Sequence, residues 1–195
     1  TIAHWQAASK QVLADAAALG GYLNNQLIHG LLKKIEYQTI MGPGTTTHMT
    51  GVYVTATDHG APEAGDTPLD TIRKAIAVVE SRGWFVDTVG LHPIDWAAIQ
   101  TIRATDSGVY LYGSPSTSGT GASPMWGKRV VPSFIVPQGN YIVGAFQTAA
   151  QLFEREAANV AVGFQNDDFT RNLVTMLAET RVALANYTPA AFRKG

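Results

Sequence analysis

Apolar residues recur with a spacing of four through the first quarter of the chain, at Leu19, Leu23, Leu27, Leu31 and Ile35. A helix places such positions on one face, because it has about 3.6 residues per turn. The pattern predicts an amphipathic helix over residues 15–40, about 37 Å long at 1.5 Å per residue. Tyr22, Ile28 and Leu32 are expected to widen its buried stripe.

The residues that flank this helix supply its start and stop signals. Asp15 is a suitable N-cap, because its carboxylate can accept hydrogen bonds from the N–H groups of the first turn. The run Gly42-Pro43-Gly44 ends the helix. Gly20, Gly21 and Gly30 each weaken it by about 1 kcal/mol relative to Ala, so packing along its length has to offset that loss.

A second helix is predicted after a segment of loop and short strands at residues 45–66. Thr67 can cap it, Pro68 suits its first position, and Asp70 lies near its positive end. Gly83 ends it. Its buried face is formed by Leu69, Ile72, Ile76 and Val79.

Shorter elements follow. A third helix is predicted from His92 to about Arg103, and residues 113–124, rich in Gly, Ser, Thr and Pro, are expected to form a mobile surface loop. Alternating or apolar runs predict strands at Phe85–Leu91, Val109–Tyr112, Val130–Val136 and Tyr141–Phe146. Residues 150–164 are ambiguous. So is Phe169–Tyr187, since its leucine spacing alone also permits a helix.

The composition favours a protein that hides surface in an assembly. Hydrophobic residues make up 46% and charged residues 15% of the chain, against an average charged share of about 25%. The net charge is −1 and there is no basic block, so a dedicated nucleic-acid binder is not expected. The absence of cysteine excludes disulfides and thiolate metal sites.

No targeting or membrane segment is evident. No stretch approaches the roughly 18 apolar residues of a membrane span. The first residues, Thr1–Trp5, lack the basic and apolar regions of a secretory signal. They also lack an initiator Met, so we expect a processed or shortened chain.

Candidate catalytic and metal motifs are weak. Gly119-Thr120-Gly121 belongs to no phosphate-binding pattern, and no Gly-x-Ser-x-Gly elbow is present. The spacing of His48, Asp58 and His59 matches no ligand pattern. We therefore expect no enzyme activity, no cofactor and no metal. A small hydrolase acting in the 113–124 loop is a distant alternative.

Two charge clusters lie on otherwise apolar segments. They contain Glu154, Arg155 and Glu156 in the first, and Glu179 and Arg181 in the second. One interpretation is a solvated face or an ion pair within the chain. The other is pairing across a subunit boundary, where charges set register and partner choice more than affinity. Glu154, Arg155, Glu156 and Arg181 are therefore candidate subunit-interface residues.

Several short motifs follow one another along nearly the whole chain. They are Ser9-Lys10-x-x-Leu13-x-Asp15, Leu91–Trp96, Asp106–Leu111, Met125–Val131, Val143–Phe146, and a closing set of Phe169, Asn172, Glu179, Arg181, Pro189, Ala191 and Phe192. In this order they resemble the major capsid proteins of tailed bacteriophages. His92, Arg129 and Ala145 depart from that pattern, where Asn, Pro and Asp or Gly are usual.

The resemblance implies an α+β protein with the Hong Kong 97-type capsid fold, which has a long spine helix, a peripheral domain sheet and an axial α/β domain. The peripheral domain would hold residues 1–44 and 150–181. The axial domain would hold residues 45–149 and 182–195. Phe169–Tyr187 would then be mostly a long strand and not a helix.

The resemblance also implies a structural subunit of an icosahedral phage or prophage capsid. Such subunits self-assemble into pentamers and hexamers that enclose DNA without sequence specificity. A scaffolding segment or protein, a maturation protease and a portal are implied partners, with no membrane. The expected location is the virion, and the host cytoplasm during assembly. An encapsulin-like compartment shell of the same fold is the alternative.

Two further expectations rest on the resemblance. The chain starts after the family's N-terminal arm and extended loop, so we expect it to fold but to assemble poorly. Some family members cross-link a loop Lys to an Asn with a Glu assisting, and Asn172 and Glu179 match those positions. Being seven apart, they would face opposite ways on a regular strand, so one bond would need them from different subunits.

Overall fold

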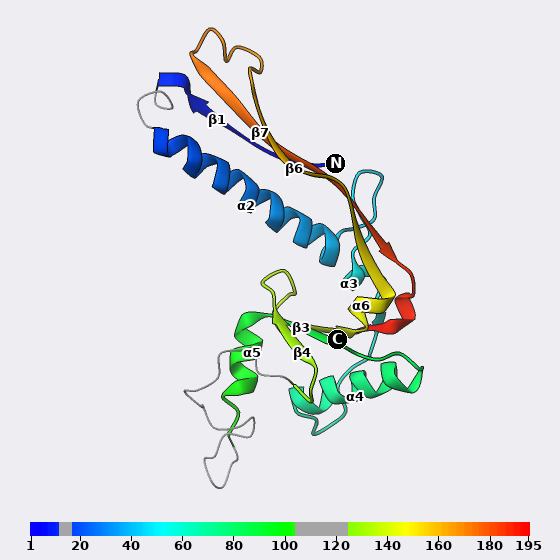
Figure 1. Cartoon of the computed structure of the whole chain (residues 1–195). Helices are drawn as coiled ribbons and strands as arrows, with labels where there is room; N and C mark the ends of the chain where they lie inside the picture. The colour runs from blue at the N-terminus through cyan, green and yellow to red at the C-terminus, as the bar shows by residue number, and fades with distance from the viewer. Residues whose placement is uncertain (12–16, 104–124) are drawn as a thin grey trace. The chain divides into compact units, whose positions relative to one another are not determined.

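The structure is a computed structural model, and it describes residues 1–11, 17–103 and 125–195 (Figure 1). The chain divides into two compact units, each built from two segments. Unit 1 contains Thr1–Thr39 and Leu152–Leu184, and unit 2 contains Ile40–Gln151 and Ala185–Gly195. No helix among the described residues is long and apolar enough to cross a membrane.

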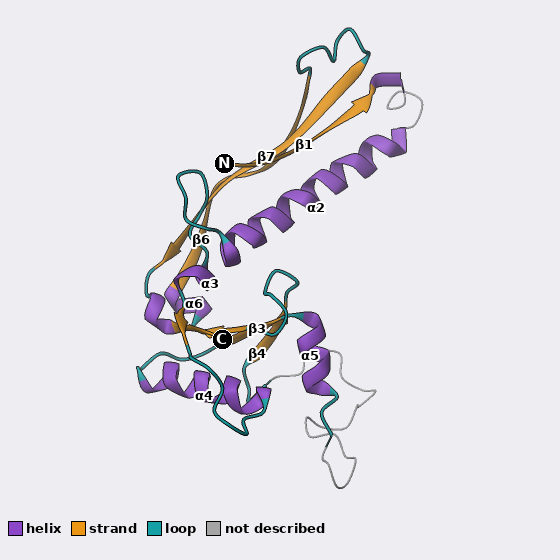
Figure 2. Cartoon of the chain, turned by 180° about the vertical axis from the view of Figure 1, so that it is seen from behind, coloured by secondary structure: helices purple, strands orange, loops and turns teal. Residues whose placement is uncertain are grey.

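Unit 1 is a three-stranded sheet with one long helix beside it (Figures 1 and 2). The strands are β1 (Ile2–Ser9), β7 (Leu173–Asn186) and β6 (Ala150–Gly163), in the order β1-β7-β6. Strand β1 runs antiparallel to β7, with Trp5 opposite Leu177. The helix is α2 (Ala17–Met41), which confirms the helix predicted over residues 15–40. Asp15, its predicted N-cap, lies outside the described residues.

One face of α2 packs on one face of this sheet. Leu23, Leu27 and Leu31 are buried against Met176 and Ala178 of β7. The predicted spacing-of-four stripe is therefore confirmed for these leucines.

The predicted widening of the stripe was wrong. The side chain of Tyr22 is 59% exposed and that of Leu32 is 55% exposed, while Ile28 is half-buried. Each helical residue turns about 100° from its neighbour, and the sheet covers only one side of α2. The outer positions therefore stay exposed or half-buried in the described part of the chain.

Strands β6 and β7 resolve the two ambiguous segments in the last quarter of the chain. Val174, Met176, Ala178 and Thr180 of β7 are buried in alternation, which is the period of a strand. Leu173 and Leu177 are four residues apart, which fits both a helix and a strand, whereas the seven residues from Leu177 to Leu184 fit one face of a helix only. The strand implied by the family resemblance is confirmed.

Unit 2 is built on a five-stranded mixed sheet in the order β2-β8-β5-β3-β4. Strand β3 is parallel to β4 and antiparallel to β5, β5 is antiparallel to β8, and β2 is parallel to β8. The strands are β2 (Thr57–Asp58), β3 (Thr88–Leu91), β4 (Arg129–Pro132), β5 (Tyr141–Gly144) and β8 (Phe192–Lys194).

Helix α4 (Pro68–Ser81) supplies much of the core of unit 2. Thr67 accepts a hydrogen bond from the Asp70 backbone N–H, and the Asp70 carboxylate accepts one from the Thr67 N–H. This capping box confirms the predicted start of the helix. Ile72, Ile76 and Val79 are buried, as predicted, in one cluster with residues of β3 and β5.

The remaining helices are α3 (Val52–Thr55), α5 (Pro93–Gln100), α6 (Phe146–Ala149) and η1 (Pro189–Ala191). The sequence did not predict α3, α6 or η1. Helix α5 ends three residues before the predicted Arg103, and His92 caps it by accepting a hydrogen bond at Nδ1 from the Ile94 N–H at 3.2 Å. The predicted strand Val109–Tyr112 and loop 113–124 lie outside the described residues.

Candidate subunit interface

Strand β6, at one edge of the unit 1 sheet, is almost entirely exposed. Every residue of β6 except Ala150 and Val160 is exposed. Leu152, Phe153 and Val162 are among the exposed apolar residues. Such an edge is an open template for pairing with another chain, and proteins that stay monomeric usually shorten, charge or cover it. Strand β6 is therefore a candidate contact surface.

The face of the unit 1 sheet that points away from α2 is also apolar and uncovered. Residues directly opposite each other on paired strands share a face. His4 packs against Gly30 of α2, so the next residue, Trp5, projects to the other side together with Leu177. Trp5, Leu177, Val162 and other residues line a groove of about 390 Å³ there.

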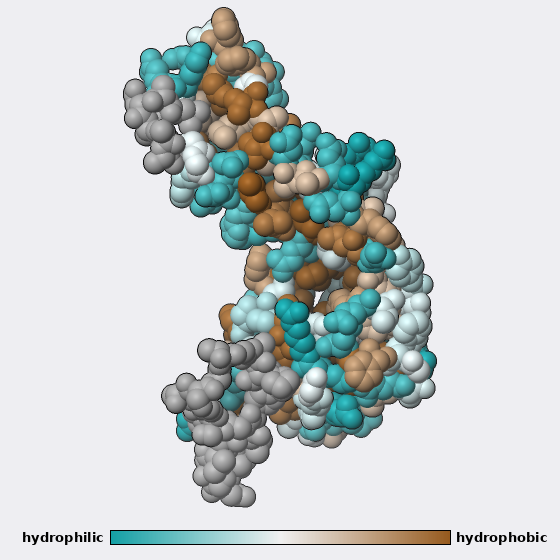
Figure 3. All heavy atoms as spheres, viewed as in Figure 1, coloured by the Kyte–Doolittle hydropathy of each residue, from teal (hydrophilic) through white to brown (hydrophobic). Residues whose placement is uncertain are grey.

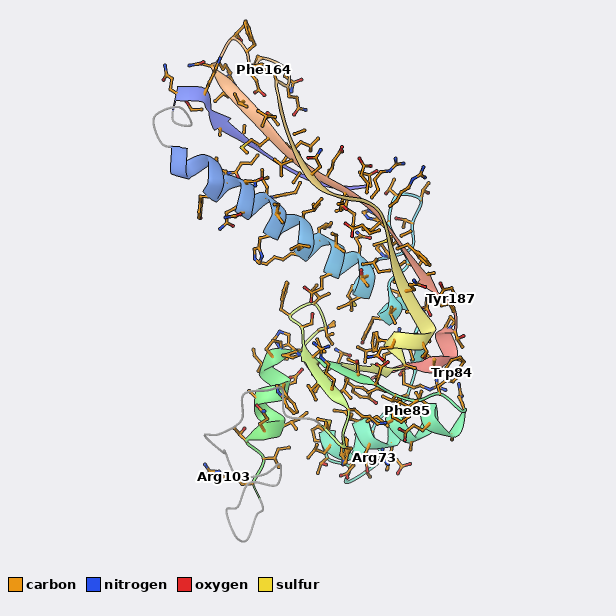
Figure 4. The ribbon with its side chains drawn as sticks, in the orientation of Figure 1. Arg73, Trp84, Phe85, Arg103, Phe164 and Tyr187 are labelled. Atoms are coloured by element: carbon orange, nitrogen blue, oxygen red, sulfur yellow. The ribbon has the colours of Figure 1, made fainter. Side chains whose placement is uncertain are left out.

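Two phenylalanines continue this apolar surface. Phe164 and Phe169, in the turn between β6 and β7, stack edge to face with 5.8 Å between ring centroids. Both are mostly exposed. Figure 4 labels Phe164, and Figure 3 shows apolar residues, in brown, along unit 1 in the upper part of the view. Apolar surface on this scale is typical of a binding face.

Asp168 fixes the turn that carries these rings. Its carboxylate accepts hydrogen bonds from Thr175 Oγ1 at 2.6 Å and from the Gln165 N–H at 2.9 Å. These bonds, the Thr175 hydroxyl first, lower the pKa of Asp168 below its ordinary value. Sequence reasoning missed this residue, although Asn166-Asp167-Asp168 between two apolar runs is a turn signal.

Unit 2 carries a different exposed cluster around α4. Phe85 is 76% exposed, and Lys128 Nζ lies 3.8 Å from its ring centroid. Glu80 binds Lys128 at 2.8 Å and Arg73 at 3.8 Å. Arg73 in turn lies 5.9 Å from the ring centroid of Trp126. Arg73 and Phe85 are labelled beside α4 in Figure 4.

A cavity of about 580 Å³ opens elsewhere in unit 2. Its walls are mostly apolar, and Asp66, Asp95 and Tyr141 also line it. The Tyr141 hydroxyl is buried and has no hydrogen-bond partner in the described structure. Burial above all, then Asp58 and Tyr53, raises the pKa of Tyr141 to about 12, so this phenol stays neutral and a poor base.

A metal site is not apparent in the part of the chain that the structure describes. There, no group of three or more His, Cys, Asp or Glu side chains is placed to hold an ion. His48, Asp58 and His59 accordingly form no such group.

The predicted charge clusters separate into two kinds. Arg181 Nε lies 4.0 Å from Glu156 Oε2 within the chain, and both side chains are about half exposed. Such a pair contributes little to stability. Glu154 and Arg155 are exposed on β6 and have no ion pair among the described residues. The candidate interface charges are therefore best placed at Glu154 and Arg155.

The comparisons with known proteins agree with this picture. The model of the phage capsid family matches residues 1–195, the whole chain. The chain belongs to the phage capsid family. It is 38% identical over 198 residues to the major capsid protein of Enterobacteria phage HK97, covering 100% of this chain and 51% of the relative. The chain thus spans about half the length of that relative.

Solved capsid structures share the fold at low sequence identity. The capsid of an empty GTA particle computed with C5 symmetry matches with a TM-score of 0.77 and 18% identity, over 98% of this chain and 71% of that one. The structure named for Microbacterium phage Oxtober96 matches with a TM-score of 0.79 and 15% identity, over 99% and 70%. The predicted Hong Kong 97-type fold is confirmed, and nothing in these matches favours the encapsulin-like alternative.

The expectation that Asn172 and Glu179 lie on one regular strand and face opposite ways needs correction. Asn172 does not lie on the strand: it precedes β7, has a φ of 57°, and its carbonyl accepts a hydrogen bond from the Lys10 N–H at 3.0 Å. Glu179 lies within β7, opposite Ala3 of β1. The six steps from Leu173 to Glu179 span about 20 Å at about 3.3 Å per residue. Asn172 and Glu179 are therefore kept apart by their distance along the strand, whichever way their side chains point.

Proposed function

We propose that this chain is the core of a structural subunit of an icosahedral phage capsid, assembled as pentamers and hexamers around DNA. The observation that carries the proposal is the unfinished surface of unit 1, in a chain whose family is that of phage capsids. Strand β6 and the Trp5–Leu177 face leave apolar groups and an open strand edge in solvent. Neighbouring copies would cover both.

The proposed mechanism is geometric and has no catalytic step. A closed ring needs head-to-tail contacts, so each copy presents two different and complementary faces. We assign unit 1 to the peripheral domain and unit 2 to the axial domain near the ring axes. The two observed units, residues 1–39 with 152–184 and residues 40–151 with 185–195, support this assignment.

The partners follow from the same proposal. A net charge of −1 suits a shell that encloses DNA without reading its sequence. A scaffolding segment or protein, a maturation protease and a portal are the partners that a phage shell requires. The protein would be found in the virion, and in the host cytoplasm during assembly.

Electron microscopy of the full-length protein tests the proposed function. Expressed alone or with its scaffold and protease, it should form closed polyhedral particles of uniform size. A protein that remains monomeric under all these conditions would contradict the proposal.

Cross-linking through Asn172 and Glu179 stays a proposal for the assembled particle. Cross-linked particles should give a ladder of bands on a denaturing gel, and Glu179→Gln should abolish it. Asn172→Gly is the matched variant, because glycine keeps the left-handed backbone while the amide is lost. A ladder that persists in both variants would exclude these residues.

A further inference from the structure

We propose that Phe85 of one copy inserts into the unit 2 cavity of the next copy, as a head-to-tail contact within a ring. This inference rests on the proposed shell function and names a pair of surfaces for it. The contact would be aromatic at its centre and charged around it.

Phe85 has the properties of an inserting group. It lies between α4 and β3 and is 76% exposed. Lys128 Nζ sits over its ring and is itself bound by Glu80, so the side chain is held in place while most of its surface meets solvent. An exposed aromatic ring that is already immobilised loses little entropy on binding, which is a property of interface hot spots.

The cavity has the properties of a receiving site. Ile72 of α4, Leu91 of β3, and Ala98 and Ile99 of α5 contribute apolar wall. Its volume of about 580 Å³ lies in the range of pockets that enclose small apolar ligands, so one aromatic ring fits. Ala98 is exposed, which gives access from outside.

The two features lie at opposite ends of one helix. Pro68, Thr71 and Ile72 at the start of α4 line the cavity. Phe85 follows the end of the helix at Ser81. A 14-residue helix is about 21 Å long. A projecting group and a receiving site on different faces of one body give a heterologous contact, which is the kind that closes rings.

The charges around the two features are complementary. Arg82 and Arg129, near Phe85 in the chain or the fold, are exposed and have no ion pair among the described residues. At the cavity, Asp95 accepts a hydrogen bond from the Gly139 N–H at 2.7 Å but has no cation partner there. Asp66, also at the cavity, is already bound by Lys74. Cations beside the Phe85 ring and the Asp95 carboxylate beside the cavity favour a second copy as the occupant.

The absence of cysteine in this chain permits a direct test. Ser81→Cys, which keeps the Phe85 ring and lies at the exposed end of α4, and Ala98→Cys are made in separate preparations of the chain, mixed at high concentration and oxidised with diamide. A disulfide between the two variants is the expected product, at about tenfold the yield of a control mixture of Val54→Cys and Ala98→Cys. Val54 is an exposed apolar residue of the same unit, and circular dichroism confirms that each variant is folded.

Three results would overturn the inference. One is a heterodimer yield no higher than that of the control. Another is preferential disulfide formation between two Ser81→Cys chains, since that contact would be isologous. The third is uptake of toluene by the cavity without any cross-link between the Ser81→Cys and Ala98→Cys chains, which would assign the cavity to a small ligand.

The full-length protein separates this inference from the proposed function. Particles that form normally from a Ser81→Cys/Ala98→Cys double variant but show no disulfide between subunits would contradict the contact and leave the shell function intact. Absence of particles from the unsubstituted protein would contradict the shell function itself. Phe85→Ser should weaken the association of subunits into pentamers and hexamers by about tenfold or more. Phe85→Trp should retain most of this association.

Discussion

The two units of this chain differ in how much apolar surface packs against their sheets. In unit 2 a core cluster of 12 buried residues joins α4, α5 and three strands. Among the described residues of unit 1 the corresponding cluster has five, and α2 packs on one face of the sheet. Because burial of apolar area is the main stabilising term, unit 2 has the larger stabilising core among the described residues. In unit 1, Trp5 and most of β6 stay exposed. Under the proposed shell function, the comparison teaches that unit 1 depends more than unit 2 on neighbouring copies to cover its apolar surface.

The largest expected loss of stability follows from a substitution in the core of unit 2. Ile76 is fully buried in α4, and Ile76→Ala should destabilise unit 2 by about 3 kcal/mol, because it removes buried methyl groups and leaves a cavity. Urea denaturation followed by circular dichroism measures the loss. Ile94→Ala, at an exposed position of the same unit, is the control and should change stability by less than about 0.5 kcal/mol. Equal effects of the two substitutions would contradict the assigned core.

A core substitution in unit 1 should lower the free energy of unfolding by less. Leu27→Ala removes a fully buried side chain of α2, and about 2 kcal/mol is expected, the low end for such changes, because the core cluster around it is small. Leu32→Ala on the same helix, at a mostly exposed position, should be nearly neutral in the free chain. The same urea experiment compares them. A larger loss for Leu32→Ala would mean that the wrong face of α2 has been assigned to the sheet.

The turn of unit 1 should show a pH dependence. The lowered pKa of Asp168 means that its charged form is favoured by folding. Its stabilisation is present above the unfolded pKa of about 3.9 and is lost as the pH falls through the lower folded value. Thr175→Val should therefore reduce the melting temperature at pH 7, with a difference that shrinks below about pH 4. Asp168→Asn should flatten the acid dependence, and an unchanged acid limb would refute the role of Asp168.

The smallest effect is expected for the exposed ion pair of unit 1. A double-mutant cycle with Glu156→Gln and Arg181→Gln should give a coupling of about 0.5 kcal/mol or less in the free chain, because both side chains are solvated. A coupling above about 1 kcal/mol would show that the ion pair stabilises the isolated subunit itself, apart from any contact with other subunits.

The sequence predicted what periodicity and capping encode. The spacing of Leu23, Leu27 and Leu31 predicted α2, and Thr67 with Asp70 predicted the start of α4. It could not show that Tyr22 is exposed, because an amphipathic pattern does not distinguish a core from a surface that meets another chain. Residues 173–186 needed the family resemblance, since a spacing of four fits both helix and strand.

The candidate interface was less predictable. Charge clusters pointed to β6 but did not separate Glu156, which pairs within the chain, from Arg155, which does not. Nothing in the local sequence distinguished Phe85 from a core phenylalanine, because its exposure depends on where the α4–β3 connection lies. Helix α3, only four residues long, gives too short a pattern to be predicted.

Hydrogen–deuterium exchange on the full-length protein, free and in assembled particles, tests most directly whether unit 1 is completed by its neighbours. Backbone amides of β6 and the segment around Trp5 should exchange rapidly in the free subunit and become strongly protected in the particle, while β5 of unit 2 stays protected in both. Equal, rapid exchange of β6 in both states would contradict the account.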